Sequence, residues 1–260
     1  MTEPQQFPSK ENHQPESYTV GGVHVSCVDR AQAVDTFFQL VSAKVGGFIT
    51  VRDAHGIVAS QTDNRLREII NSARMTLPDG IPIVWVGKLK NAAVQRVTGA
   101  EFVDSVLRDP RARRIRHYFY GGQTENTSRV VAHATELLGS DAIAGWHCPP
   151  FRSAGAIEEN SVIAGIVAAH PDVIWVGLST PKQEYWMANH TAHFPETILV
   201  GVGAVFDFLA GTQTRAPVIV QRIGFEWLYR LIQEPKRLWP RYKRVVPGML
   251  RILIAEAMRR

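Results

Sequence analysis

The chain has 260 residues, of which 45% are hydrophobic and 20% are charged. This composition is typical of globular proteins and excludes a fibrous or wholly disordered chain, while the length suits one large domain or one domain with an appendage. The formal net charge is +5, but residues 215–260 hold eleven basic and three acidic side chains, whereas residues 1–214 hold eighteen basic and twenty-one acidic ones. The chain as a whole is therefore not basic, and the positive charge belongs to its last part.

The ends of the chain and its cysteines set further bounds. Residues 1–17 lack the apolar segment of a signal peptide and predict a disordered tail. Cys27 and Cys148 are too few for a disulfide framework, which agrees with a reducing compartment. The longest apolar stretch, residues 197–211, is short and interrupted by Asp207, so no membrane-spanning helix is predicted.

Short apolar runs alternate with longer amphipathic stretches through the middle of the chain. The apolar runs predict six strands, at residues 45–51, 75–77, 116–120, 142–146, 173–176 and 198–202. The amphipathic stretches predict helices at residues 63–72, 81–89, 98–107, 125–138, 158–169 and 183–193. This alternation predicts an α/β fold over residues 18–214, a Rossmann-like and mostly parallel sheet flanked by helices.

Ligands of such sheets bind at the carboxyl ends of the strands, so the turns there are the first places to look for chemistry. Asp79 lies between a proline and a glycine directly after an apolar run. A rigid turn would fix its carboxylate, and partial burial would raise its pKa toward that of a general base. The alternative is that Asp79 caps the helix that begins near Ile81.

Two further turns suit a phosphate-bearing ligand. Arg96 and Gly99 stand where a guanidinium and a close backbone would hold a diphosphate, although a surface arginine before a helix is the plain alternative. Lys182 and Gln183 open a helix after a strand, where backbone amides and a cation attract an anion. A capping box formed by Thr180 and Gln183 is the structural alternative.

Other polar residues carry weaker signals. Asp207 lies in an apolar segment, so it either pairs with a basic residue such as Arg215 or faces a ligand. The sequence Gly201-Val-Gly203 is an incomplete dinucleotide fingerprint, because Phe206 stands in place of the third glycine. Lone turn histidines such as His55 usually make structural hydrogen bonds. No Asp-x-Asp pair and no Cys/His cluster with zinc spacing occurs, so no metal and no other cofactor is expected.

Residues 215–260 predict a basic, amphipathic, helical appendage. Aromatic and aliphatic residues recur there at helical spacing, with arginines and lysines between them, at Trp227, Leu228, Leu231, Ile232, Leu238, Trp239 and Tyr242. This pattern favours docking to anionic lipid headgroups. Nucleic-acid binding agrees less well with the aliphatic content, and a packing helix with a solvated basic face is the remaining alternative.

Read in chain order, the turns closely resemble the WecG/TagA/CpsF glycosyltransferase family (glycosyltransferase family 26) over residues 20–245. The matching motifs are Thr50-Val51, Leu77-Pro-Asp-Gly80, Arg96-Val-Thr-Gly99, Tyr118-Phe-Tyr-Gly-Gly122, Pro149-Pro-Phe-Arg152, Asp172-Val-Ile-Trp-Val-Gly177, Thr180-Pro-Lys-Gln-Glu-Tyr-Trp-Met187, the segment 201–211, Arg215-Ala-Pro217 and the segment 224–239.

The resemblance implies an inverting, metal-independent glycosyltransferase that moves a sugar from a UDP-sugar to a polyprenyl-diphosphate-linked saccharide, in cell-envelope or exopolysaccharide biosynthesis. The UDP-sugar donor would carry an N-acetylmannosaminyl, a uronosyl or a hexosyl group. Asp79 matches the family's proposed base and Thr50 its partner. The positions that match substrate contacts are Arg96, Gln183 and Asp207, together with Arg230, Arg237 and Arg241 of the appendage.

The sequence departs from the family where Thr50-Val51-Arg52 replaces a frequent Thr-x-Asn. We expect Arg52 to contact a different donor, such as an acidic sugar. The resemblance further implies a cytoplasmic enzyme, peripheral on the inner face of the cell membrane and without nucleic acid, and it leaves a homo-oligomer open. A nicotinamide-dependent oxidoreductase and a non-catalytic lipid- or nucleic-acid-binding module are the two competing interpretations.

Overall fold

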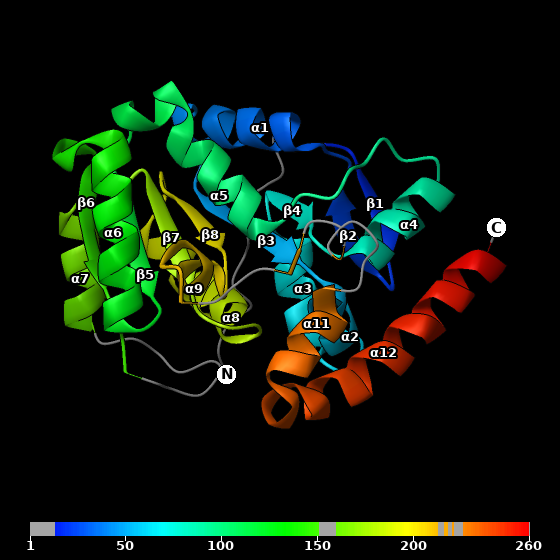
Figure 1. Ribbon diagram of the computed structural model, residues 1–260. Helices are drawn as coiled ribbons and strands as arrows, with labels where there is room; N and C mark the ends of the chain where they lie inside the picture. Colours follow the sequence, from blue (N-terminus) through cyan, green and yellow to red (C-terminus); the bar gives the residue numbers. More distant parts are fainter. Residues whose placement is uncertain (1–13, 151–159, 213–215, 218–219, 221–225, 260) are drawn as a thin grey trace.

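The computed structural model describes residues 14–150, 160–212, 216–217, 220 and 226–259 (Figure 1). At its centre lies a six-stranded sheet with the order β4–β3–β8–β7–β5–β6, in which every neighbouring pair is parallel. The strands are β3 (Gly47–Arg52), β4 (Met75–Pro78), β5 (His117–Gly121), β6 (Ile143–His147), β7 (Val173–Gly177) and β8 (Ile198–Gly201). The predicted α/β fold and its six strands are confirmed.

Helices cover both faces of the sheet. One face packs against α1 (Arg30–Ser42), α5 (Gly99–Arg108), α6 (Thr124–Leu138) and α9 (Val205–Leu209). The other packs against α3 (Asn64–Asn71), α7 (Asn160–Ala168) and α8 (Lys182–His190). A strand buried on both faces is apolar along its whole length, which is why the apolar runs located these strands so well.

Three elements at the N-terminal side were not predicted. A hairpin of β1 (Ser17–Val20) and β2 (Val23–Ser26) is antiparallel and turns at Gly21 and Gly22, both at positive φ. Helix α1 follows it, and the short helix α2 (Ala54–Ala59) replaces an expected polar turn. A signal for α1 exists in the sequence, since Asp29 and Gln32 form a capping box at its start.

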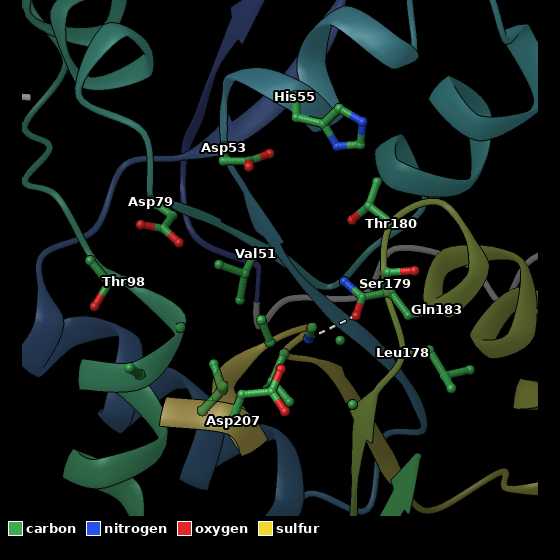
Figure 2. Close-up of a pocket in the computed structure, with 18 of the residues that line it drawn as sticks. Val51, Asp53, His55, Asp79, Thr98, Leu178, Ser179, Thr180, Gln183 and Asp207 are labelled. Atoms are coloured by element: carbon green, nitrogen blue, oxygen red, sulfur yellow. Dashed lines mark hydrogen bonds between the residues drawn. The ribbon is translucent and has the colours of Figure 1, made fainter. Parts of the chain in front are cut away.

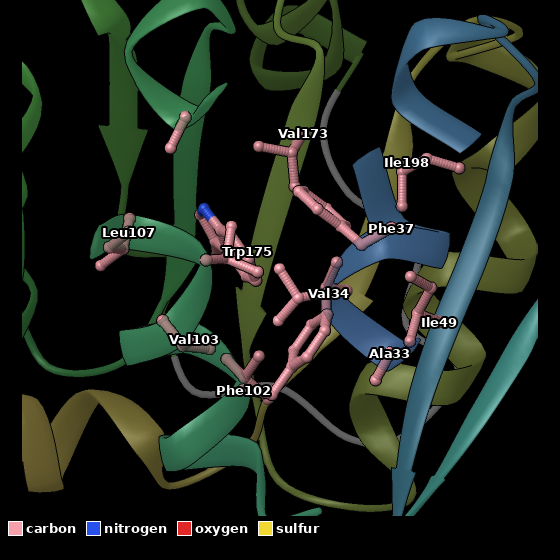
Figure 3. Close-up of a cluster of buried hydrophobic side chains, with 14 of the residues drawn as sticks. Ala33, Val34, Phe37, Ile49, Phe102, Val103, Leu107, Val173, Trp175 and Ile198 are labelled. Atoms are coloured by element: carbon pink, nitrogen blue, oxygen red, sulfur yellow. The ribbon is translucent and has the colours of Figure 1, made fainter. Parts of the chain in front are cut away.

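On the face of the sheet that packs against α1 and α5, aromatic side chains surround the fully buried Trp175. Figure 3 shows Phe37 of α1 and Phe102 of α5 beside it, with the Phe37 ring stacked at 5.7 Å between centroids. The indole Nε1 of Trp175 donates a hydrogen bond to Nδ1 of His117 at 3.1 Å. Nε2 of His117 lies 3.0 Å from the carbonyl oxygen of Ala112. Because the indole only donates and a carbonyl only accepts, this pairing requires the neutral imidazole.

The C-terminal part forms α11 (Glu226–Gln233) and α12 (Pro235–Met258), and α12 packs against α2 and α4 (Ile81–Leu89) (Figure 1). Met249 and Ile252 of α12 share a hydrophobic cluster with the β1–β2 hairpin. At the far end of α12, the buried Glu256 pairs with Lys90 at 2.7 Å and accepts the Gly21 N–H at 3.0 Å. The division predicted near residue 215 falls at residues outside the described part.

No helix among the described residues is long and apolar enough to cross a bilayer.

The neutral state of His117 predicts a pH-dependent stability. Burial lowers its pKa from 6.5 to about 4, so between these values the unfolded chain binds a proton that the folded chain does not. The free energy of unfolding should therefore fall by about 3 kcal/mol between pH 7 and pH 4 from this residue alone. Urea titrations across this range should show a smaller decline in a His117→Gln variant. The exposed His24 provides the control, because His24→Gln should keep the full decline.

Candidate active site

A cavity of about 1160 Å³ opens at the carboxyl ends of the strands (Figure 2). Each of the six strands, or the turn directly after it, contributes to its wall. These residues include Val51, Asp79, Tyr120, Cys148, Gly177 and Gly201. Residues of α4, α11 and α12 complete the lining, so the C-terminal helices form part of the cavity wall.

Asp79 follows β4 directly and lines this cavity. Helix α4 takes Gly80 as its N-cap and has no side-chain cap, so the alternative in which Asp79 caps this helix is wrong. The carboxylate accepts a hydrogen bond from Nη2 of Arg96 at 3.3 Å, and Arg96 also donates from Nε to the Asp79 carbonyl at 2.5 Å. The same guanidinium pairs with Glu226 of α11 at 2.7 Å. Arg96 therefore joins the β4 turn to the C-terminal part of the chain.

The surroundings of Asp79 raise its pKa to about 6. Burial is the largest cause, and the negative charges of Asp53 and Glu226 act in the same direction. The positive charge of Arg96 opposes them. A carboxyl with this pKa is mostly deprotonated at neutral pH and is a stronger base than an ordinary aspartate.

Gly99 begins α5 and lies where the helix meets the cavity. A Cβ there would lie 3.0 Å from Cγ2 of Val205 and 3.5 Å from Val51, so only glycine fits without displacement. The preceding Thr98 caps α5 in a capping box with Glu101. The cavity thus receives the N-terminus of α5, an end with positive electrostatic character.

Lys182 and Gln183 form the first turn of α8 and line the cavity. The N-cap is Pro181 and no side-chain cap forms, so the capping-box alternative for Thr180 and Gln183 is wrong. Oε1 of the buried Gln183 accepts the Gly203 N–H at 2.8 Å, the dashed contact in Figure 2. The side chain is therefore fixed against the turn after β8.

Asp207 of α9 also lines the cavity. Its Oδ1 accepts a hydrogen bond from Nδ2 of Asn126 at 2.7 Å, whereas the alternative partner Arg215 lies outside the described residues. Asn126 was not anticipated from the sequence, because its proximity to Asp207 depends on how α6 and α9 pack. Glu226 was likewise not singled out.

Thr50 and Arg52 do not line the cavity. They alternate with Val51 along β3, and because successive side chains of a strand point to opposite faces, only Val51 reaches the cavity. Thr50 is fully buried and its hydroxyl lies 3.1 Å from that of Thr76. Arg52 is fully buried in an ion pair with Glu184 of α8. The expected direct contact between Arg52 and a donor sugar is not supported by this arrangement.

Of the three arginines predicted in the appendage, the structure describes the side chain of one. Arg241 of α12 is exposed at the cavity wall, while the side chains of Arg230 and Arg237 lie outside the described part. Arg241 also acts on His55, whose pKa is lowered chiefly by burial and further by the charges of Arg241 and Arg52, against the opposing charge of Asp53. A neutral imidazole therefore faces the cavity near neutral pH.

Within the described part of the chain, no three His, Cys, Asp or Glu residues lie together as ligands for a metal ion.

The comparisons with known proteins agree with this geometry. The model of the "Glycosyl transferase WecG/TagA/CpsF family" matches residues 18–260. Two similar proteins, from Bacillus subtilis (strain 168) and Bacillus spizizenii, are 29% and 32% identical to this chain; the matches cover 83% and 75% of it and 82% and 74% of the relatives. A third, from Staphylococcus aureus (strain MW2), is 27% identical, over 83% of each chain. All three are named N-acetylglucosaminyldiphosphoundecaprenol N-acetyl-beta-D-mannosaminyltransferase.

The buried pair of Arg52 and Glu184 predicts a coupled effect on stability. Arg52→Met or Glu184→Gln alone leaves a buried charge without its partner and should lower the free energy of unfolding by about 3–5 kcal/mol. The double variant should recover much of that loss, because no unpaired charge remains. Urea unfolding of the four proteins measures this coupling. The exposed pair Arg108–Asp104 is the matched control, and its single variants should cost less than about 1 kcal/mol.

Proposed function

Because this chain belongs to the WecG/TagA/CpsF family of glycosyltransferases, we propose that it transfers a sugar from a UDP-sugar to a saccharide linked to a polyprenyl diphosphate, with inversion and without a metal ion. The observation that carries the proposal is the carboxylate of Asp79, with its raised pKa, in one cavity with Arg241, Lys182 and the N-terminus of α8. Family membership favours this function over that of an oxidoreductase or a non-catalytic module.

In the proposed reaction, Asp79 accepts the proton of the acceptor hydroxyl. The hydroxyl oxygen then forms a bond to the anomeric carbon of the donor from the side opposite the diphosphate. The bond between that carbon and the diphosphate oxygen breaks, and its electron pair leaves with UDP. One displacement of this kind inverts the anomeric configuration, and it needs a base on one side and stabilised negative charge on the other.

Stabilisation of the leaving diphosphate is assigned to cations and helix ends of the cavity. Lys182 and the N-terminal amides of α8 lie at the turn after β7, and α5 brings a second N-terminus at Gly99. Such groups can attract phosphate without the help of a metal ion. Asp207, held by Asn126, offers a carboxylate that accepts hydrogen bonds from sugar hydroxyls.

The names of the relatives direct the choice of substrates. They describe transfer of N-acetylmannosamine to N-acetylglucosaminyl-diphosphoundecaprenol, so this pair is the first to test. Because Arg52 is buried against Glu184 and does not line the cavity, it gives no reason to expect an acidic donor. A screen of N-acetylmannosaminyl, uronosyl and hexosyl donors, with UDP release as the readout, identifies the donor.

Replacement of Asp79 tests the proposed base. Asp79→Asn should lower kcat by at least about 100-fold, because the amide accepts no proton, while UDP still binds. UDP release and calorimetric UDP binding measure the two effects separately. The control is Asp104→Asn, a surface carboxylate outside the cavity, which should keep wild-type turnover. Near-normal turnover of Asp79→Asn would remove Asp79 from this role.

The pH profile gives an independent check of the same group. Since the base acts deprotonated and its pKa is about 6, kcat/KM should decline tenfold per pH unit well below pH 6 and level off above it. The charge of Arg96 lowers this pKa, so Arg96→Met should move the limb to higher pH. A profile that is flat from pH 5 to pH 8 would contradict the assignment.

We also propose that α12 holds the enzyme against an anionic membrane surface, as a peripheral protein on the inner face of the cell membrane. Trp239 is 60% exposed and Ile254 52% exposed on this helix. Exposed basic residues accompany them, at Lys236, Arg241, Lys243, Arg244, Arg251 and Arg259. Exposed apolar and basic side chains on one helix are what an interfacial helix needs.

Vesicle binding tests this surface. Replacing Lys243 and Arg244 together by glutamate should weaken cosedimentation with anionic vesicles at least tenfold, since each basic residue near such a surface contributes about 1 kcal/mol. Raised salt should weaken wild-type binding as well. The matched control is glutamate at Arg113 and Arg114, an exposed pair remote in the sequence. Equal loss in the control would show that net charge, and not α12, determines binding.

A further inference from the structure

One part of the cavity forms an apolar arm. Its walls are the first turn of α4, at Ile81 and Pro82, and one side of α12. The α12 residues are Tyr242, Val245, Val246, Met249, Leu250 and Leu253. At about 1160 Å³ the cavity exceeds the range of about 300–1,000 Å³ that is usual for one small-molecule site. It has room for a second ligand beside the donor.

The arm begins beside the proposed base. Asp79, Gly80, Ile81 and Pro82 are consecutive, and all four line the cavity, so the wall changes from a carboxylate to apolar side chains within three residues. The same change occurs along α12, where the cation Arg241 precedes the apolar lining residues. From Arg241 to Leu253 the helix rises by roughly 18 Å. Both walls therefore present charge at one end and hydrocarbon beyond it.

This order of chemistry matches one kind of ligand. A saccharide that reaches Asp79 and is joined through a diphosphate to a polyprenol presents, in sequence, hydroxyls, negative charge and hydrocarbon. We infer that the arm between α4 and α12 binds the first isoprene units of the acceptor's polyprenyl chain, next to its diphosphate at Arg241. This inference rests on the proposed function and adds a binding site to it.

The far end of the arm leads toward exposed apolar side chains. Leu250 lines the cavity and is 56% exposed, and Ile254, one turn further along α12, is 52% exposed. Trp85, one turn after Ile81 on α4, is 55% exposed. These exposed apolar side chains lie beyond the arm, where the remainder of a long chain would continue toward the membrane.

Two contacts hold α12 against its neighbours. Gly248 packs so closely on α2 that a Cβ would lie 2.7 Å from Cγ1 of Val58. Glu256 is tied to Lys90, which directly follows α4. The first contact fits α12 closely on α2, and the second ties the far end of α12 to the residue that follows α4.

The test uses water-soluble acceptors without vesicles or detergent, below their micelle concentrations. N-acetylglucosaminyl diphosphates carrying an ethyl, a geranyl or a farnesyl group are compared by UDP release with the donor found in the screen. The wild-type enzyme should show a KM for the farnesyl acceptor at least tenfold below that for the ethyl acceptor, because several buried CH2 groups are added. Equal KM values would overturn the inference.

Variants of α12 then test whether the lower KM for the farnesyl acceptor depends on the arm. Leu250→Ser, at an exposed position that tolerates a polar side chain, and Leu253→Ser should each reduce the farnesyl preference at least threefold. Met258→Ser is the matched control, because Met258 lies on the same helix but does not line the cavity, and it should retain the preference. Thermal unfolding confirms that each variant is folded.

The outcomes separate the inference from the proposed function. A preference that survives in both leucine variants, or is lost equally in Met258→Ser, would overturn the arm as the binding site. If α12 contacts only the bilayer, the variants weaken vesicle binding while chain length has no effect in solution, which also overturns it. Absence of UDP release with every acceptor, including an undecaprenyl acceptor in vesicles, would instead contradict the proposed function.

Discussion

The ion-pair system of Asp79, Arg96 and Glu226 is the interaction on which the arrangement of the site depends. One guanidinium lies between the carboxylate after β4 and a carboxylate of α11. Without this cation, Asp53, Asp79 and Glu226 would stand near one another as uncompensated negative charges. Arg96 therefore attaches the C-terminal helices to the turn after β4 and also keeps the pKa of Asp79 from rising further.

The cavity is consequently lined by residues that run from Val51 to Leu253. The strands supply its floor, and α12 supplies a wall whose far end is tied to the N-terminal hairpin through Glu256 and Gly21. Glu256 is buried and paired with Lys90, a contact that is worth more than an exposed pair because its removal leaves a buried charge. A chain without α12 would lose that part of the wall.

The sequence located the sheet and most of the site because both depend on local patterns. Parallel strands buried on both faces are continuous apolar runs, and the turn after each strand is where ligands bind, which led to Asp79, Lys182 and Asp207. Thr50 could not be placed in this way, because the pleat of β3 decides which side chain reaches the cavity. Pairings such as Asn126 with Asp207, or Arg96 with Glu226, depend on packing between elements that are far apart in the sequence. No local pattern encodes them.

Arg52 stands where the family often has asparagine, and its charge suggested a contact with an acidic donor sugar. The structure explains this residue differently. The guanidinium is neutralised by Glu184 below the cavity wall, so it adds no net charge to the surface that a substrate meets. Glu184 in turn accepts a hydrogen bond from Nε2 of Gln183 at 2.8 Å, while Oε1 of Gln183 is held by the Gly203 N–H. This substitution can therefore act on substrates indirectly, through the orientation of Gln183 and through the charge that lowers the pKa of His55. Arg52 therefore supports the cavity wall from below, as the cation that compensates the buried Glu184.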